Sequence, residues 1–261
     1  MYRQWKGKRA LVTGASGGIG EEISRQLAAA GVNLVLTARR EEQLNDLAAE
    51  LTAAHGIEAM VIPSDLVVPE SPALLYDSTE GKGITIDILV NNAGFGNHGK
   101  FAEIPWGSTV SQIQVNVVAL TELTLLFLQT MKHREEGWIL NVASVGGFLP
   151  VPGYATYGAG KAYVRSFTEA LAEEYRGSGI TFTALCPGPI RTDFAKNAGH
   201  QLTSIQELAY APVQPCARAA LRGLHKGKRV VVPGFLMKLS TLSLKIIPRR
   251  FAGWLAGLLM K

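Results

Sequence analysis

Short apolar runs alternate with amphipathic stretches along most of the chain. Seven runs are rich in Val, Ile, Leu and Thr, and they occupy residues 9–13, 33–38, 58–62, 86–90, 137–142, 181–185 and 229–232. Most of these runs are apolar without interruption, which is typical of strands that helices cover on both faces. The pattern therefore predicts seven strands of one parallel sheet.

The stretches between these runs have apolar residues at helical spacing. Helices are predicted at residues 18–30, 41–55, 106–132, 157–176 and 212–225, and a shorter one at 72–79. Gly31 and Gly177 stand where two of these helices should stop, since glycine readily adopts the left-handed conformation that ends a helix. Strands that alternate with helices predict a doubly wound α/β fold in a single domain over residues 1–233.

Composition narrows the class of protein. The 261 residues are 47% hydrophobic and 18% charged, which excludes a disordered chain, and two cysteines exclude a disulfide-stapled miniprotein. We expect Cys186 and Cys216 to be plain thiols in a reducing compartment. Because no apolar segment follows the basic residues of the first nine positions, we also expect no secretory signal and a cytoplasmic protein.

The net charge of +5 is unevenly distributed along the chain. Residues 208–261 contain ten Lys or Arg and no acidic residue. Within this part, residues 234–261 are predicted to form a basic amphipathic extension, whose apolar positions at helical spacing are Phe251, Trp254, Leu255, Leu258 and Leu259. The apolar stretch at 251–259 is too short and too interrupted to span a bilayer. It could attach to a membrane surface, bind an acidic protein such as an acyl carrier protein, or pack over a substrate cleft or a subunit interface.

A glycine-rich turn follows the first predicted strand. The segment Thr13-Gly14-Ala15-Ser16-Gly17-Gly18-Ile19-Gly20 leads directly into a helix. Glycines let backbone N–H groups approach a pyrophosphate, and the positive end of the following helix attracts it. The turn therefore favours a dinucleotide site, although glycine-rich turns also occur wherever a strand and a helix pack closely.

The end of the second predicted strand indicates which dinucleotide is bound. NAD sites place an acidic residue there for the ribose 2′-hydroxyl, but this chain has Arg39 and Arg40. A guanidinium suits a 2′-phosphate, so we predict NADP(H), with Arg39 as the contact. Alternatively, both arginines begin an exposed helix and pair with Glu41 and Glu42.

Two residues four apart suggest acid–base chemistry. Tyr157 and Lys161 share a helical face, about 6 Å apart along the axis. A phenol that exchanges protons at neutral pH benefits from a nearby cation, which stabilises the phenolate. Taken alone, the pair is better explained by a buried tyrosine and a lysine that extends to solvent on an ordinary helix.

Together these motifs resemble the short-chain dehydrogenase/reductase family over about residues 6–232. The motifs are the glycine turn, Asn91-Asn92-Ala93-Gly94, Asn116, Ser144, Tyr157-x-x-x-Lys161 and Pro187-Gly188-Pro189-Ile190-Arg191-Thr192. The resemblance implies a Rossmann-type fold, a homodimer or homotetramer, and NADP(H) as cofactor. Many NADP-preferring relatives carry a basic residue where this chain has Gly17, and this departure places more weight on Arg39.

The resemblance also assigns residues. The catalytic set would be Asn116, Ser144, Tyr157 and Lys161. Tyr157 would give a proton to the substrate carbonyl and Ser144 would bond the same oxygen, while Lys161 would lower the pKa of Tyr157 and Asn116 would anchor a water. The cofactor would be bound by Gly14, Ser16, Gly18, Ile19, Gly20, Arg39, Asp65, Asn91, Ala93, Gly94, Tyr157, Lys161, Pro187, Gly188, Ile190 and Thr192.

Aromatic and apolar residues in the loops at 95–101, 146–154 and 193–212 favour an apolar carbonyl substrate, such as a 3-oxoacyl compound or a steroid-like ketone. We therefore predict an NADPH-dependent carbonyl reductase. The alternatives are a dehydrogenase that works in the oxidative direction and a non-catalytic NADP-binding sensor or scaffold. We expect no nucleic-acid partner and, from the spacing of the five histidines, no metal.

Overall fold

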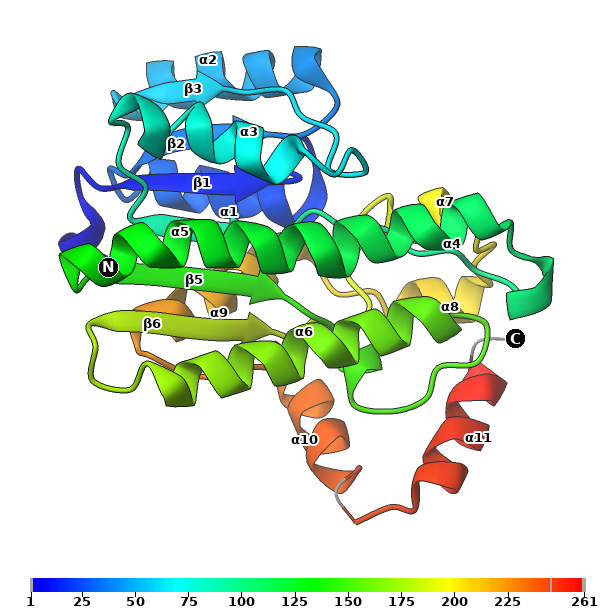
Figure 1. The fold of residues 1–261 in the computed structure, drawn as a ribbon. Helices are drawn as coiled ribbons and strands as arrows, with labels where there is room; N and C mark the ends of the chain where they lie inside the picture. Colours follow the sequence, from blue (N-terminus) through cyan, green and yellow to red (C-terminus); the bar gives the residue numbers. More distant parts are fainter. Residues whose placement is uncertain (1, 245, 260–261) are drawn as a thin grey trace.

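One parallel seven-stranded sheet forms the centre of the protein, in the order β3-β2-β1-β4-β5-β6-β7 (Figure 1). The strands are β1 Arg9–Thr13, β2 Asn33–Thr37, β3 Ala59–Val61, β4 Ile88–Asn91, β5 Gly137–Val142, β6 Ile180–Leu185 and β7 Val230–Val231. The computed structural model describes residues 2–244 and 246–259, apart from the side chains of Ile205, Leu208 and Leu259. Met1, Lys245, Met260 and Lys261, which belong to the predicted domain and extension, lie outside the described residues.

All seven predicted strands are present, and four of them are shorter than predicted, including β2, which ends at Thr37. The backbone N–H of Ile86 donates to the Glu80 carboxylate at 2.9 Å instead of to a neighbouring strand, and regular β4 begins at Ile88. The N–H of Glu58 donates to the side chain of Asn33, and regular β3 begins at Ala59. The strand at the other edge, β7, pairs with β6 over two residues only.

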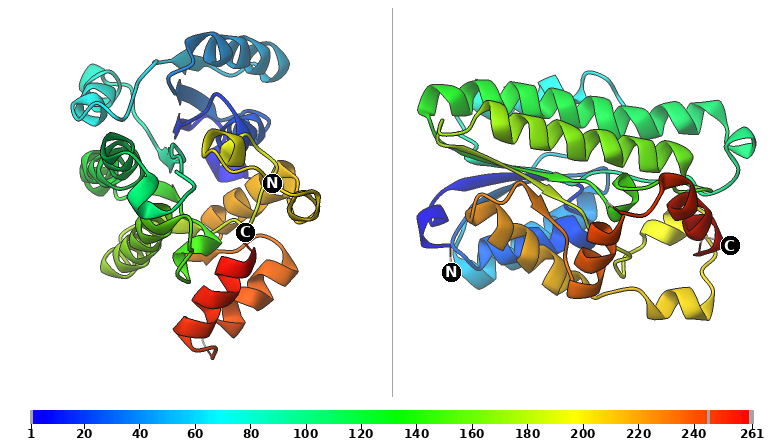
Figure 2. Two further views of the ribbon diagram at one scale, coloured as in Figure 1. Left: turned by 90° about the vertical axis from the view of Figure 1, so that its right-hand side faces the viewer. Right: turned by 90° about the horizontal axis from the view of Figure 1, so that it is seen from below.

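Helices cover both faces of the sheet, as Figure 2 shows in side view. They are α1 Gly18–Ala28, α2 Glu41–His55, α3 Ser71–Asp77, α4 Trp106–Ile113, α5 Leu120–Arg134, α6 Ala155–Glu174, α7 Phe194–Asn197, α8 Ser204–Leu208, α9 Val213–His225, α10 Phe235–Ser243 and α11 Arg249–Leu259. Helices α1, α2 and α9 lie on one face, and α3, α5 and α6 lie on the other. The predicted single-domain doubly wound fold is confirmed in this arrangement of layers.

The predicted helix 106–132 is interrupted by a π-helical segment at Gln114–Ala119, between α4 and α5. Such segments insert a residue into a helix and often occur at functional sites. By length and composition Trp106–Arg134 could cross a membrane, but Leu123, Phe127 and Met131 are fully buried against the sheet. Here the apolar composition reflects a core helix.

A row of buried polar side chains crosses the sheet beneath its carboxyl end. The amide of Asn91 in β4 donates to Thr124 of α5 at 3.0 Å and to Asn141 of β5 at 2.9 Å. The amide of Asn141 donates in turn to Thr168 of α6 at 3.0 Å. Two strands and two helices are thus linked by side-chain hydrogen bonds, a strong constraint in a low-dielectric interior.

Three helices beyond the carboxyl end of the sheet fall in segments for which we predicted none, namely α7, α8 and α10. The predicted helical spacing after Pro248 is confirmed by α11. In Figure 1, α10 and α11 form a hairpin that projects from the body of the protein.

Candidate functional site

The glycines in the turn after β1 lie too close to neighbouring atoms to carry a side chain. Gly14 and Gly18 have φ of +65° and +59°, which L side chains rarely adopt. A Cβ on Gly14 would lie 2.9 Å from Nδ2 of Asn92, and one on Gly20 would lie 2.4 Å from the carbonyl oxygen of Gly14. Ser16 and Ile19 complete the turn, and α1 begins with its first N–H groups available to an anion.

Arg40 is held across this turn. Its guanidinium donates to the carbonyl oxygen of Ser16 at 2.7 Å and to the Ser16 hydroxyl at 3.1 Å. Arg39, the predicted 2′-phosphate contact, is exposed next to it. Two guanidinium groups therefore stand at the end of β2, and the contribution of Arg40 to the shape of the turn was missed at the sequence level.

The Asn91-Asn92-Ala93-Gly94 motif divides into two roles. Asn91 is only 2% exposed and belongs to the buried polar row, so its side chain does not reach the turn. Asn92 is the residue that does, because its amide donates to the carbonyl oxygens of Thr13 and Gly14 at 2.9 and 3.2 Å. The N–H of Ala93 donates to the Thr13 hydroxyl at 2.9 Å. The motif thus fastens the loop after β4 to the turn after β1.

Asp65 stands at the end of the loop that follows β3. Its carboxylate accepts from the N–H of Val67 at 3.1 Å, and its carbonyl oxygen accepts from the Ser71 hydroxyl at 2.7 Å. These bonds fix a half-buried carboxylate in the loop between β3 and α3.

Ser144 and Tyr157 meet at the carboxyl end of β5. The Ser144 hydroxyl oxygen accepts from the N–H of Gly146 at 3.0 Å, which fixes its position at the start of the loop. Burial raises the pKa of Tyr157 to about 12, while the nearby Ser144 hydroxyl acts in the opposite direction and lowers it. At neutral pH the phenol is therefore protonated and can donate a proton.

Lys161 is buried beneath this pair. Its ammonium group donates to the carbonyl oxygen of Val142 at 2.7 Å and lies 5.7 Å from the centre of the Tyr157 ring. Burial lowers the pKa of Lys161 to about 8. Burial has the largest effect on the pKa of Tyr157, and the lowering effect that we expect from Lys161 stays a prediction.

Asn116 lies in the π-helical segment and faces the loop after β4. Its amide accepts from the N–H of Phe95 at 3.1 Å and donates to the carbonyl oxygen of Phe95 at 2.8 Å. A Cβ on Gly94 would lie 2.8 Å from Oδ1 of Asn116 and 3.4 Å from Nζ of Lys161. The four predicted catalytic residues are thus brought to one end of the sheet.

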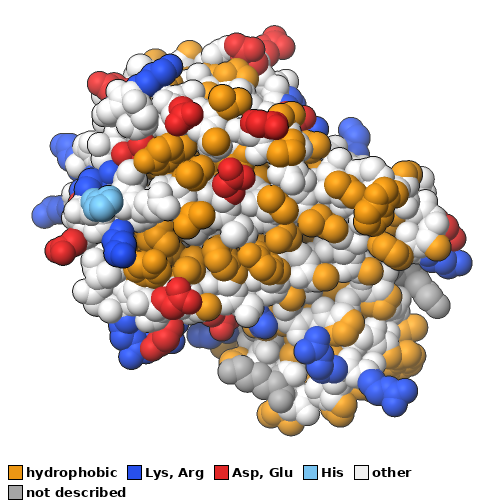
Figure 3. All heavy atoms as spheres, viewed as in Figure 1, with side chains coloured by type: hydrophobic (Ala, Val, Ile, Leu, Met, Phe, Trp, Pro, Cys, Tyr) orange, Lys and Arg blue, Asp and Glu red, His pale blue; other side chains and the backbone are white. Residues whose placement is uncertain are grey.

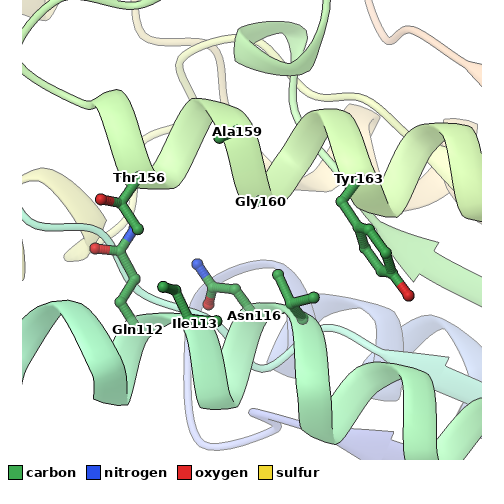
Figure 4. Close-up of a pocket in the computed structure, with 8 residues that line it drawn as sticks. Gln112, Ile113, Asn116, Thr156, Ala159, Gly160 and Tyr163 are labelled. Atoms are coloured by element: carbon green, nitrogen blue, oxygen red, sulfur yellow. The ribbon is translucent and has the colours of Figure 1, made fainter.

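A cavity of about 220 Å³ separates the helix of Asn116 from the helix of Tyr157 (Figure 4). Its lining comes from both helices and is largely apolar, with Ile113 and Val117 on one side and Ala159 and Tyr163 on the other. In Figure 4 the side chains of Gln112 and Thr156 point toward one another at one end of the cavity.

The Pro187–Thr192 segment follows β6 and contacts the loop at 145–154. We call these two segments the walls of the candidate site. The carbonyl oxygen of Pro187 accepts from the N–H of Val145 at 2.9 Å, and Ile190 forms a parallel bridge with Ala211. The Thr192 methyl group would touch a Cβ on Gly18 at 3.0 Å. A polar cavity of about 290 Å³ beside the start of α1 is lined in part by Arg191 and Thr192.

Two loop histidines, His98 and His200, lie beside Tyr154. The rings of His98 and His200 stack with centroids 4.0 Å apart, and Nδ1 of His200 is hydrogen-bonded to the Tyr154 hydroxyl at 3.0 Å. Tyr154 and Phe194 both contact the ring of Tyr157, with centroids at 5.9 and 5.1 Å. Rings from two segments far apart in sequence therefore pack against the phenol.

The sequence that forms this site matches the model of a known protein family. The model for short chain dehydrogenases matches residues 8–203, which include the glycine turn, Asn116, Ser144, Tyr157 and Lys161. The chain belongs to the short-chain dehydrogenase/reductase family. It is therefore an oxidoreductase by family, and the resemblance inferred from the motifs is confirmed.

Alignments with similar proteins cover most of this chain. A 7beta-hydroxysteroid dehydrogenase of Collinsella aerofaciens is 30% identical over 232 residues, covering 88% of this chain and 87% of that protein. A very-long-chain 3-oxoacyl-CoA reductase of Anas platyrhynchos is 34% identical, covering 73% of this chain but only 62% of that longer protein. A short-chain dehydrogenase from Sphingobium yanoikuyae in complex with NADPH superposes with a TM-score of 0.82 at 31% identity, covering 90% and 92% of the two chains.

Proposed function

We propose that this short-chain dehydrogenase reduces an apolar ketone or aldehyde to an alcohol, with NADPH as the hydride donor. The observation that carries the proposal is the grouping of three side chains: a half-buried Tyr157 that is protonated at neutral pH, the Ser144 hydroxyl beside it, and the buried Lys161 ammonium group 5.7 Å from the centre of the Tyr157 ring. Two neighbouring hydroxyl donors suit the oxygen of a substrate carbonyl group, because this oxygen gains negative charge during reduction.

The protein groups act on that oxygen. When bound, NADPH supplies the hydride. Tyr157 transfers its phenolic proton to the substrate oxygen as the carbonyl is reduced, and Ser144 donates a hydrogen bond to the same oxygen. The ammonium group of Lys161 then stabilises the phenolate that Tyr157 becomes. Because these donors are already in position, they stabilise the transition state more than the ground state.

The residues that would hold the cofactor fit a dinucleotide. The Gly14, Gly18 and Gly20 turn leaves no space for a Cβ and leads into the uncapped start of α1, as a pyrophosphate requires. The residues directly after β2 are Ala38, Arg39 and Arg40, with no carboxylate among them, and the exposed Arg39 supports a contact with a 2′-phosphate. The NADPH-bound relative from Sphingobium yanoikuyae supports the same choice.

The substrate is proposed to be apolar, such as a 3-oxoacyl compound or a steroid-like ketone. The rings of Tyr154 and Phe194 beside Tyr157 support this proposal. The two relatives whose names specify a hydroxysteroid and a very-long-chain 3-oxoacyl-CoA support the same class.

A homodimer or homotetramer in the cytoplasm is also proposed. The outer sides of α4, α5 and α6 expose apolar side chains, with Trp106 72% and Leu125 55% exposed. Figure 3 shows these apolar side chains gathered in a band over this face. Burial of such a patch between subunits would remove it from water.

The test is oxidation of NADPH and of NADH against 3-oxoacyl thioesters, steroid ketones and simple aldehydes. Turnover that prefers NADPH, favours the apolar substrates and disappears in Tyr157→Phe would support the proposal. Tight binding of NADPH with no turnover on any member of the panel would contradict it and favour a sensor. A preference for small polar carbonyls would contradict the substrate class alone.

A further inference from the structure

Helix α11 turns its large apolar side chains outward and its small ones inward. The outward face carries side chains that are 43–59% exposed, namely Phe251, Trp254, Leu255 and Leu258. The inward face carries Ala252, Gly253, Ala256 and Gly257. A helix on the surface of a water-soluble domain normally turns its large apolar side chains inward and its polar side chains outward. The outer face of α11 therefore has the composition of a surface that something covers.

The inward face is shaped to fit a loop of the candidate site. A Cβ on Gly253 would lie 3.4 Å from Pro150, and one on Gly257 would lie 3.3 Å from Pro152. Both prolines belong to the loop that connects Ser144 to Tyr157. The small residues thus let α11 rest directly on the wall of the candidate site, which leaves the large side chains on the outside.

Helix α10 is organised in the same way. Its outward apolar side chains and their exposed fractions are Phe235 80%, Leu236 75%, Leu239 55% and Leu242 48%. On its inner side the Met237 sulfur would lie 2.8 Å from a Cβ on Gly188, in the opposite wall of the candidate site. Between the two helices Ile246 is 87% exposed. The hairpin therefore rests on both walls and presents nine large apolar side chains to its surroundings.

The charges of the hairpin indicate which kind of partner covers it. Residues 234–261 contain five Lys or Arg and no acidic residue, and Lys238, Arg249 and Arg250 are exposed. On the face drawn in Figure 3, the lower projection carries orange and blue side chains and no red ones. A second copy docked through a twofold axis would place these like charges against each other. An acidic protein would match the charges but would not need nine exposed apolar side chains.

We propose that residues 234–261 form an extension to the 1–233 domain that docks the protein on an anionic lipid surface. The apolar faces of α10 and α11 lie at the boundary between headgroups and acyl chains, and the Lys and Arg side chains pair with lipid phosphates. Phe251 and Trp254 suit this boundary, where aromatic residues are enriched. The docked hairpin places both walls of the candidate site next to the membrane. This inference goes beyond the proposed function and does not require it.

Sedimentation of the full-length protein with vesicles tests the proposal. We expect strong binding to phosphatidylcholine vesicles that contain one third phosphatidylglycerol, and weak binding to phosphatidylcholine alone. The combined substitution Lys238→Glu, Arg249→Glu and Arg250→Glu should weaken binding to the anionic vesicles more than about 100-fold, since each basic residue near such a surface contributes about fivefold.

A matched variant controls for the change of net charge. Lys82→Glu, Lys132→Glu and Lys226→Glu reverse three exposed charges that lie away from the hairpin, at η2 (Glu80–Lys82), near the end of α5 and just after α9. This variant should bind the anionic vesicles almost as well as the unmodified protein. If both triple variants lose binding equally, net charge alone explains it and the proposed surface is wrong.

Tryptophan emission locates the contact. Trp254 should shift to shorter wavelength on anionic vesicles, and the shift should disappear in Trp254→Phe but persist in Trp106→Phe, which removes an exposed indole of the α4 helix. Absence of vesicle binding would overturn the proposal. So would a change of oligomeric state in the hairpin variant without vesicle binding, or binding to an acyl carrier protein in place of vesicles, because these outcomes identify another partner.

Discussion

The Arg40 guanidinium closes over the glycine turn by donating to the carbonyl oxygen of Ser16 at 2.7 Å. Arg40 thereby shapes the turn, while Arg39, which is exposed beside it, is the predicted 2′-phosphate contact. The two neighbouring arginines should therefore contribute differently to cofactor binding.

We expect Arg39→Ala to raise KM for NADPH about tenfold or more, with little change for NADH, because a charge-assisted contact to the 2′-phosphate is lost. Arg40→Ala should raise KM for both cofactors, since the turn beneath the pyrophosphate loses its support. Steady-state kinetics with each cofactor distinguishes the two. Equal effects of Arg39→Ala on NADPH and NADH would defeat its assignment.

Removing the phenolic hydroxyl should stop the chemistry but leave the cofactor site intact. We expect Tyr157→Phe to lower kcat about 10²–10⁴-fold, the usual contribution of a positioned acid. Binding of NADPH, followed by its fluorescence, should stay within about twofold. Tyr154→Phe is the matched control, because it removes a neighbouring hydroxyl that is bonded to His200. A similar loss of kcat in both variants would contradict the role of Tyr157.

The buried lysine should set the alkaline limit of activity. Burial lowers the pKa of Lys161 to about 8, so its positive charge is present below that pH and is lost above it. Tyr157, with a pKa of about 12, stays protonated over this range. We therefore expect kcat/KM for carbonyl reduction to fall as the pH rises through about 8. In Lys161→Arg this fall should move to higher pH, because a guanidinium keeps its charge; a profile that stays level above pH 8 in the unmodified protein would oppose this account.

Asn116 should contribute measurably to stability. Asn116→Leu leaves the N–H and carbonyl group of Phe95 without their partner, which should cost about 2–4 kcal/mol of unfolding free energy. Gln114→Leu is the control in the same π-helical segment, since the buried Nε2 of Gln114 has no hydrogen-bond partner. Urea denaturation of both variants measures the difference. A change of the same size in Gln114→Leu would show that the segment, and not the Asn116 amide, is responsible.

The strands and the site motifs could be predicted because each has a local signature. An apolar run between polar turns predicts a buried strand, and Tyr157 and Lys161 share a helical face wherever the helix begins. The start of α6 at Ala155, two residues earlier than predicted, therefore leaves the pair unchanged.

Features that depend on tertiary contacts were not visible in the sequence. Asn91 and Asn92 are identical in type, and only their place at the end of β4 sends one into the core and the other to the glycine turn. The stacking of His98 on His200 joins two loops about a hundred residues apart. The π-helical turn at Asn116 likewise has no periodic signature, since one extra residue per turn is an effect of packing.

The hydrogen-bonded row from Thr124 through Asn91 and Asn141 to Thr168 works as a spacer between the two helices that carry the candidate site. Its length is set inside the core, so the gap between the Asn116 helix and the Tyr157 helix does not depend on the loops above it. Substitutions in the loops at 95–101 and 193–212 can therefore change which molecules enter the candidate site. The geometry of proton transfer stays the same. Evolution can in this way vary the substrate and the reaction independently.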